Sequence, residues 1–277
     1  MTRSAARNPI RRARRGGALK LHRGGGFGEV SKLQPGAKSL APQALPSGLH
    51  TAIVLPITIG VGPNLARKVG RGGARNRADR QSQALTTAQV ANLLDAIGHA
   101  KVLGLPLNRM VTVHWKAAGV PLHGMANATG RFTDLLSKCI ARHGHRTAWV
   151  WVHENGDFKG WHCHLLAHVP PLAVPKATKL QKRWLRSITG RPYSATVIHS
   201  RPIGGRLGVE ASLPAVHAFN LEVVASYVLK GAHPSALELF ALKRSAPGGL
   251  IIGKRCSTSA NIGAAARKSW TLECQGS

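Results

Sequence analysis

The segment 153–164 reads His153-Glu154-Asn155-Gly156-Asp157-Phe158-Lys159-Gly160-Trp161-His162-Cys163-His164. Its centre, Asn-Gly-Asp, is a strong turn signal. The flanking runs 147–154 and 161–169 are rich in strand-forming residues, so the segment predicts a β-hairpin. Side chains two apart on a strand point to the same face, so His162 and His164 should share one face of the sheet.

The register of this hairpin decides whether the two histidines have an acidic neighbour. If Glu154 lies opposite His162, it faces the same side of the sheet, and Val152 then lies opposite His164. One carboxylate and two imidazoles suit Mg²⁺ or Mn²⁺ acting as a Lewis acid. Since the chain has 14 histidines, the alternative is that this pair only packs.

A zinc site built from histidines alone is the rival interpretation. It would use the four histidines of this region: His153, His162, His164 and His168. On a strand, His153 should face away from Glu154, which makes it a poor partner for His162. None of the four cysteines lies in a C-x-x-C pair, so a thiolate zinc site is not supported either.

The regions around the hairpin alternate between helical and strand patterns. Helical spacing of apolar residues predicts helices over 84–103, 129–143, 176–188 and 214–231, with a last helix from residue 261. Strand patterns cover 108–115 and 193–199. This order predicts an α+β fold with a largely antiparallel central sheet and flanking helices.

The helical pattern over 214–231 contains a possible nucleophile. Tyr227 and Lys230 are three residues apart and would share one helix face. A nearby ammonium favours the phenolate form of a tyrosine and can also hold a phosphate. Attack of that phenolate on a phosphodiester would give a phosphotyrosine. The alternative is a core tyrosine beside a surface lysine. The only other tyrosine, Tyr193, has no lysine three residues later.

The composition points to a polyanionic partner. The 277 residues include 39 Lys+Arg and 10 Asp+Glu, a formal net charge of +29. This charge excludes an enzyme for cationic substrates and favours nucleic acid, with an anionic membrane surface second. The longest apolar run, 52–61, contains Pro56 and is too short to span a membrane. No secretory signal pattern is present, so we expect a cytoplasmic protein with reduced cysteines.

The charge is distributed unevenly and predicts three regions. Residues 1–80 carry 16 Lys+Arg and 2 Asp+Glu, which predicts a basic, largely disordered arm with one candidate strand at 52–59. Residues 81–240 form the predicted catalytic domain, and residues 241–277 a basic tail or short helix. The helix over 176–188 is expected to bind phosphates, although a solvated face is the alternative. Its basic residues are Lys176, Lys179, Lys182, Arg183 and Arg186.

Taken together, the H-x-H strand and the downstream Y-x-x-K resemble the HUH endonuclease superfamily. Cys163 stands at the position between the histidines where this family has a hydrophobic residue. The single Tyr227 resembles the one-tyrosine rolling-circle replication initiators of plasmids and phages. The resemblance covers roughly residues 105–235.

The resemblance implies a fold, a reaction and partners. The fold would be a ferredoxin-like (RRM-like) antiparallel sheet, with a divalent metal on its central strands and Tyr227 facing the metal. Glu154 would be the third metal ligand, with His114 as a substitute. The reaction would be nicking and religation of single-stranded DNA at an origin, through a 5′-phosphotyrosine and a free 3′-OH. Origin hairpin DNA would be one partner. A host helicase would be another, because the sequence contains no phosphate-binding loop for helicase activity of its own.

Other functions also fit the sequence. A conjugative relaxase or a single-tyrosine transposase would use the same chemistry. A non-enzymatic basic protein that packages or regulates nucleic acid, or an RNA-binding protein, would need the charge but not the joint set of Glu154, His162, His164 and Tyr227.

Overall fold

The computed structural model describes residues 78–204 and 213–275. Most of the predicted basic arm, 1–77, lies outside the described residues, and so does the candidate strand 52–59. None of the described helices combines the length and apolar character that a membrane span requires.

The core of the described chain is a five-stranded antiparallel sheet. Its strand order is β5-β2-β4-β3-β7. The strands are β2 (Arg109–Val113), β3 (Trp149–Gly156), β4 (Gly160–Ala167), β5 (Ile198–Pro202) and β7 (Cys256–Thr258). With helices α2 (Met125–Ala141) and α3 (Val174–Thr189), the order β2-α2-β3-β4-α3-β5 is the ferredoxin-like arrangement. The predicted α+β fold is therefore confirmed.

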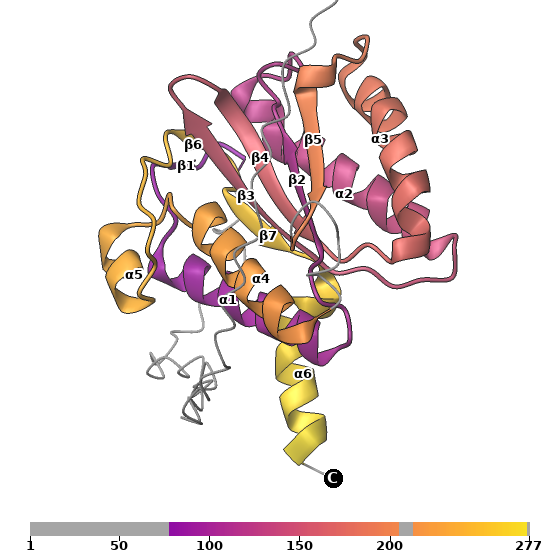
Figure 1. The fold of residues 1–277 in the computed structure, drawn as a ribbon. Coiled ribbons are helices and arrows are strands. Elements are labelled where there is room, and N and C mark those ends of the chain that lie inside the picture. The colour runs from indigo at the N-terminus through magenta and orange to yellow at the C-terminus, as the bar shows by residue number, and fades with distance from the viewer. Residues whose placement is uncertain (1–77, 205–212, 276–277) are drawn as a thin grey trace, which may run out of the picture. The chain divides into compact units, whose positions relative to one another are not determined.

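Helices cover both faces of this sheet (Figure 1). Helices α2 and α3 bury their apolar sides, including Phe132 and Trp184, in one core. Every second residue of β2, β3 and β4 points into this core. Helices α1 (Thr87–Val102) and α4 (Pro214–Val228) pack against the opposite face, where Leu93 and Val228 contribute to a second core. Successive strand residues alternate between these two cores, because the side-chain period of a strand is two.

The segment after residue 240 is part of the folded unit. It contains helix α6 (Ala264–Gln275), as the prediction of a tail or short helix allowed. It also supplies β7, which pairs with β3, and β6 (Ile251–Ile252), which pairs with β1 (Gln81–Ser82) in a separate two-stranded sheet. The folded unit therefore extends past residue 240. A three-residue strand such as β7 leaves almost no periodic signal in a sequence.

The other boundaries differ from the expectations by a few residues. Helix α1 begins after Thr86, whose side chain forms a capping box with Gln89. The strand predicted at 193–199 begins only at residue 198, because Ala195–Val197 form a 3-10 turn. Helix α4 ends at Val228 and not at residue 231. A short helix, α5 (Pro234–Leu239), follows it. Further 3-10 turns are Leu122–Gly124, Pro171–Ala173 and Ala260–Ile262.

The hairpin turn lies slightly later than the sequence indicates. Asn155 and Gly156 still belong to β3, and the turn is made by residues 157–159. Gly160 follows with φ +62°, a conformation that residues with a side chain rarely adopt. This three-residue loop lets Gly156 pair with Gly160, and it thereby fixes the register of both strands.

Candidate metal centre and nucleophile

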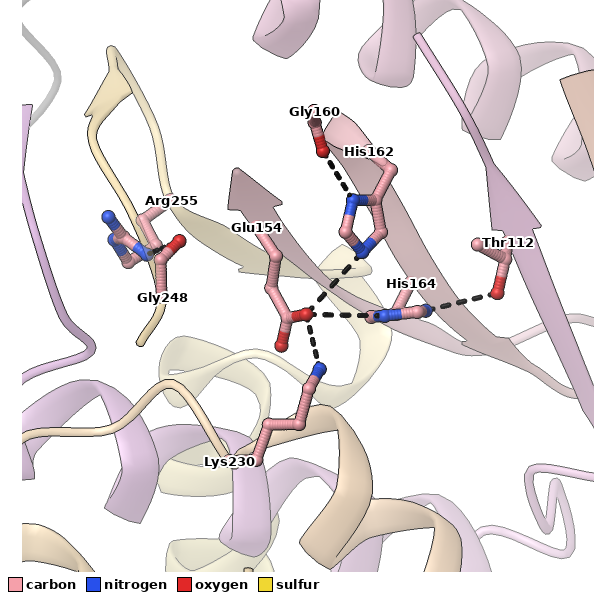
Figure 2. Close-up of polar contacts among 8 residues, drawn as sticks. All are labelled: Thr112, Glu154, Gly160, His162, His164, Lys230, Gly248 and Arg255. Atoms are coloured by element: carbon pink, nitrogen blue, oxygen red, sulfur yellow. Dashed lines mark hydrogen bonds and ion pairs between the residues drawn. The ribbon is translucent and has the colours of Figure 1, made fainter. Parts of the chain in front are cut away.

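The hairpin register brings the predicted acid and the two histidines together. Glu154 on β3 pairs with His162 on β4, and Val152 pairs with His164, so the expected register is confirmed. All three candidate ligands therefore lie on one face of the sheet, on its central strand β4 and the neighbouring strand β3. Figure 2 shows their side chains converging on one point.

The three side chains form a tight, buried cluster. The Nε2 atoms of His162 and His164 each lie 3.4 Å from Oε2 of Glu154. Ligand atoms of the three residues lie within 4.8 Å of one another, which is compact enough to hold one metal ion. The exposed fractions are only 4%, 5% and 2% for Glu154, His162 and His164. Burying these polar groups without a shared partner would be costly.

The second nitrogen of each imidazole is held by a neighbouring oxygen. Nδ1 of His162 donates to the carbonyl of Gly160 at 2.8 Å, and Nδ1 of His164 lies 3.0 Å from Oγ1 of Thr112. Such outer contacts orient the rings and leave Nε2 as the metal-binding atom. Nε2 of His164 and Oε1 of Glu154 are buried and have no hydrogen-bond partner. These orphaned atoms fit a site for a divalent cation.

The ammonium of Lys230 lies at this cluster. Its Nζ forms a close ion pair with Oε2 of Glu154, the same oxygen that faces both imidazoles (Figure 2). Burial alone would raise the pKa of Glu154, but the facing imidazoles of His162 and His164 and the charge of Lys230 hold that pKa well below its usual range. The carboxylate is therefore ionised and able to bind a cation.

Tyr227 lies directly next to the group of Glu154, His162 and His164, which we name the metal cluster because its ligand atoms could hold one ion. Its ring meets the ring of His164 edge to face, with 5.1 Å between centroids. The Nζ of Lys230 lies 4.3 Å from the centroid of the Tyr227 ring, and the guanidinium carbon of Arg244 lies 5.8 Å from it. The Y-x-x-K pair is thus adjacent, although Lys230 lies two residues beyond the end of α4.

The expectation that Lys230 favours the phenolate form of Tyr227 is wrong. Burial and the negative charge of Glu154 raise the pKa of Tyr227, while Arg201 and Arg244 act in the opposite direction. The reason is geometric. Lys230 lies over the ring face and is paired with Glu154. The negative charge of Glu154 therefore offsets most of the effect that the ammonium would have on the pKa of the hydroxyl.

His114, the substitute third ligand, lies outside the compact cluster. Its ring centroid is 5.5 Å from that of His162 and 5.6 Å from that of His199. Burial and the neighbouring His162 lower the pKa of His114 to about 4. Among the described residues, the metal-sized group consists of Glu154, His162 and His164 alone. Sequence reasoning missed His199, which pairs with Thr112 and so shares the face of the cluster.

The rival four-histidine zinc set is not assembled among these residues. His153 is fully buried on the opposite face, between Thr129 and the carbonyl of Lys254. Nδ1 of His168 donates to the carbonyl of Pro106, away from the cluster. The alternation of strand residues separates His153 from Glu154, as the sequence indicated.

The basic residues of α3 are exposed but do not face the metal cluster. Helix α3 packs against the core that contains Cys163, whereas the cluster lies on the face that carries His162 and His164. Any phosphate bound by α3 is therefore not the phosphate that Tyr227 could reach. The exposed side chains are Lys176, Lys179, Lys182, Arg183 and Arg186.

Comparisons of this chain with protein-family models, with curated proteins and with solved structures found no match.

Proposed function

We propose that this protein is a metal-dependent endonuclease that nicks single-stranded DNA at a replication origin and religates it, with Tyr227 as the nucleophile. One observation carries the proposal. The ring of Tyr227, from helix α4, lies against His164 of a buried Glu/His/His cluster formed by the β3–β4 hairpin. A protein that only binds nucleic acid does not need a tyrosine beside a set of metal ligands.

The proposed cofactor is Mg²⁺ or Mn²⁺, held by Glu154, His162 and His164. When bound, the cation would supply Lewis-acid polarisation of the phosphodiester. Tyr227 would attack the phosphorus, so that a bond forms between its phenol oxygen and phosphorus while the bond from phosphorus to O3′ breaks. The phenol proton passes to O3′, which leaves a free 3′-OH and a 5′-phosphotyrosine. Attack by a 3′-OH on that phosphotyrosine reverses the step and rejoins the strand.

The basic side chains around Tyr227 would favour an anionic substrate. Lys230 and Arg244 lie against its ring, and Arg201 is close enough to influence its pKa. Positive charge at the point where a phosphodiester is attacked stabilises the charge that develops in the transition state. The same chemistry would serve a relaxase or a transposase. We place the protein in the cytoplasm, with origin hairpin DNA and a host helicase as partners.

The decisive experiment is covalent capture of DNA by the purified protein. Labelled single-stranded oligonucleotides from the protein's own replicon are incubated with Mn²⁺ or with EDTA and separated on a denaturing gel. We expect a Mn²⁺-dependent protein–DNA adduct that is lost in Tyr227→Phe and kept in Tyr193→Phe. An adduct that persists in Tyr227→Phe would refute the assignment of the nucleophile.

A separate measurement tests the metal cluster without relying on activity. Titration calorimetry should show one Mn²⁺ bound per chain, with binding lost in Glu154→Gln, which keeps the size of the side chain. His199→Ala is the matched control, because His199 lies on the same face but outside the cluster. Equal binding by Glu154→Gln and the unmodified protein would exclude this cluster as the metal site.

The second candidate function is non-enzymatic nucleic-acid binding. It is favoured by the net charge of +29 and by the exposed basic side of α3. This function predicts steep salt dependence of binding with no effect of Mn²⁺. Tight binding without an adduct on any oligonucleotide would support it over the endonuclease.

A further inference from the structure

The exposed residues of helix α3 are either basic or uncharged. The helix contains no acidic residue, and its five basic side chains are all exposed. The opposite side of the helix is buried through Ala177, Gln181, Trp184 and Leu185. We name the exposed residues Lys176, Lys179, Lys182, Arg183 and Arg186 the α3 surface.

The neighbouring helix extends this positive charge. Helix α2 packs beside α3, where Nη2 of the exposed Arg131 donates to the carbonyl of Ser187. Arg142, at the end of α2, is also exposed. The one acidic residue of α2, Asp134, is already paired with Lys138 at 2.8 Å. No acidic side chain of these two helices is therefore left to neutralise the α3 surface.

The sheet separates this surface from the metal cluster. On β4, Cys163 points into the core shared with α2 and α3, while His162 and His164 on either side of it point to the opposite face. In Figure 1, α3 and α4 likewise lie on different sides of the sheet. A DNA segment on the α3 surface cannot be the segment held at Tyr227.

We propose that the α3 surface binds the phosphate backbone of double-stranded DNA, apart from the strand that reacts at Tyr227. The surface suits a duplex better than a single strand because α3 offers no exposed aromatic ring. Trp184 is buried, and the Tyr193 ring is covered by the ammonium of Lys182 at 5.3 Å. Single strands are usually held by stacking of bases on such rings, whereas a duplex exposes mainly phosphates.

The dimensions of the helix agree with contacts to several phosphates. Lys176 and Arg186 are ten positions apart, which corresponds to about 15 Å along an α-helix. Duplex DNA carries one negative charge per roughly 1.7 Å of its axis, so this length faces several phosphates. The preference for a duplex depends on the surface alone. The choice of DNA over RNA rests on the proposed function.

The test compares two variants that lose the same charge. Lys176→Ala/Lys179→Ala/Lys182→Ala removes three lysines from the α3 surface. Lys101→Ala/Lys254→Ala/Lys268→Ala removes three exposed lysines elsewhere. Both are made in the full chain carrying Tyr227→Phe and measured in EDTA, so that binding does not depend on nicking. Binding of a labelled 30-bp duplex is followed by fluorescence anisotropy over a series of salt concentrations.

We expect the α3 variant to lower the slope of log K against log salt by about 2 to 3, since each lost phosphate contact contributes about 0.9. The control variant should lower it by less than about 1. Equal losses in the two variants would overturn the proposal. An equal loss for a single-stranded oligonucleotide would also overturn it, by showing that the surface does not prefer a duplex.

A second measurement uses the unmodified protein, so its result does not depend on whether the variants fold. Acetylation of lysines, read by mass spectrometry, should be suppressed at Lys176, Lys179 and Lys182 when the duplex is present. No protection at these lysines would contradict the proposal. Stronger protection by double-stranded RNA, or by phosphatidylserine vesicles, would reassign the surface to that partner. A missing covalent adduct, by contrast, would affect only the proposed function.

Discussion

At the scale of single residues, metal binding by Glu154, His162 and His164 would depend on how each imidazole is oriented. His164 can bind a metal through Nε2 only if its ring proton is on Nδ1, where it is donated to Oγ1 of Thr112. Thr112 comes from β2, a strand outside the hairpin. One hydroxyl therefore positions the ring of a candidate ligand that a different part of the chain supplies.

Replacement of Thr112 tests this orienting contact. Thr112→Val keeps the shape of the side chain but removes the acceptor, so we expect Mn²⁺ affinity to fall by about 10- to 100-fold. Titration calorimetry measures the change. Thr196→Val, at an exposed threonine, should leave the affinity unaltered. Identical affinities for the two variants would mean that Thr112 does not orient His164.

Lys230 places a positive charge where a cation would bind. Its ammonium is paired with Oε2 of Glu154, so a divalent cation bound to the same oxygen would be repelled by it. We expect Lys230→Met to bind Mn²⁺ at least about tenfold more tightly, while adduct formation falls because the charge beside Tyr227 is lost. Calorimetry and the capture gel give the two readouts, with Lys243→Met as the exposed control. Weaker Mn²⁺ binding by Lys230→Met would contradict this competition.

At the scale of elements, a buried chain of hydrogen bonds holds the back of the hairpin. The Trp115 indole N–H donates to Thr129 Oγ1 at 2.8 Å, and that hydroxyl lies 2.8 Å from Nε2 of His153. Nδ1 of His153 in turn donates to the carbonyl of Lys254 at 2.8 Å. This series of hydrogen bonds connects α2, β3 and the segment that leads into β7. It therefore fixes the strand that carries Glu154.

Removal of the central hydroxyl should destabilise these elements together. Thr129→Val leaves the buried Trp115 and His153 nitrogens without their partner, a cost of about 1–3 kcal/mol. For a folded unit of this size, each kcal/mol lowers the melting temperature by about 2–4 °C. Thermal unfolding followed by circular dichroism measures the shift. Thr178→Val, on the exposed side of α3, should unfold within about 1 °C of the unmodified protein.

At the scale of the whole molecule, the buried histidines make stability depend on pH. Burial lowers the pKa of His153 to about 3, whereas in the unfolded chain an imidazole titrates near 6.5. Below pH 6.5 the unfolded state therefore binds a proton that the folded state does not, and stability falls as the pH falls.

This dependence can be measured by urea unfolding of the metal-free protein. Between pH 7.5 and 5.5, His153 alone should remove about 1.4 kcal/mol from the free energy of unfolding. The carboxylates scarcely titrate in this range, so their contribution stays small. In His153→Gln the loss over the same interval should be smaller by about that amount. The same pH dependence in this variant would show that His153 is not responsible.

The sequence by itself determined the local features of this protein. The alternation of side chains is encoded in consecutive residues, so the shared face of His162 and His164, and the separation of His153 from Glu154, could be predicted. The pairing of Glu154 with His162 was only a conditional expectation, because the turn at 157–159 lies later than Asn155-Gly156-Asp157 indicates. The net charge follows from composition, and the helical periods of α1, α2 and α3 are also encoded in consecutive residues. They gave the fold class and the basic side of α3.

Only the tertiary structure decided how distant segments meet. Lys230 is paired with Glu154, 76 residues away, and not with the hydroxyl of Tyr227. The buried Arg255 donates hydrogen bonds to Ser82, 173 residues away. It precedes β7, a strand that has no clear signal in the sequence. The α3 surface lies behind the sheet and not over the metal cluster. Periodicity records which face of an element is apolar, but the partner of that face is selected by packing over the whole chain.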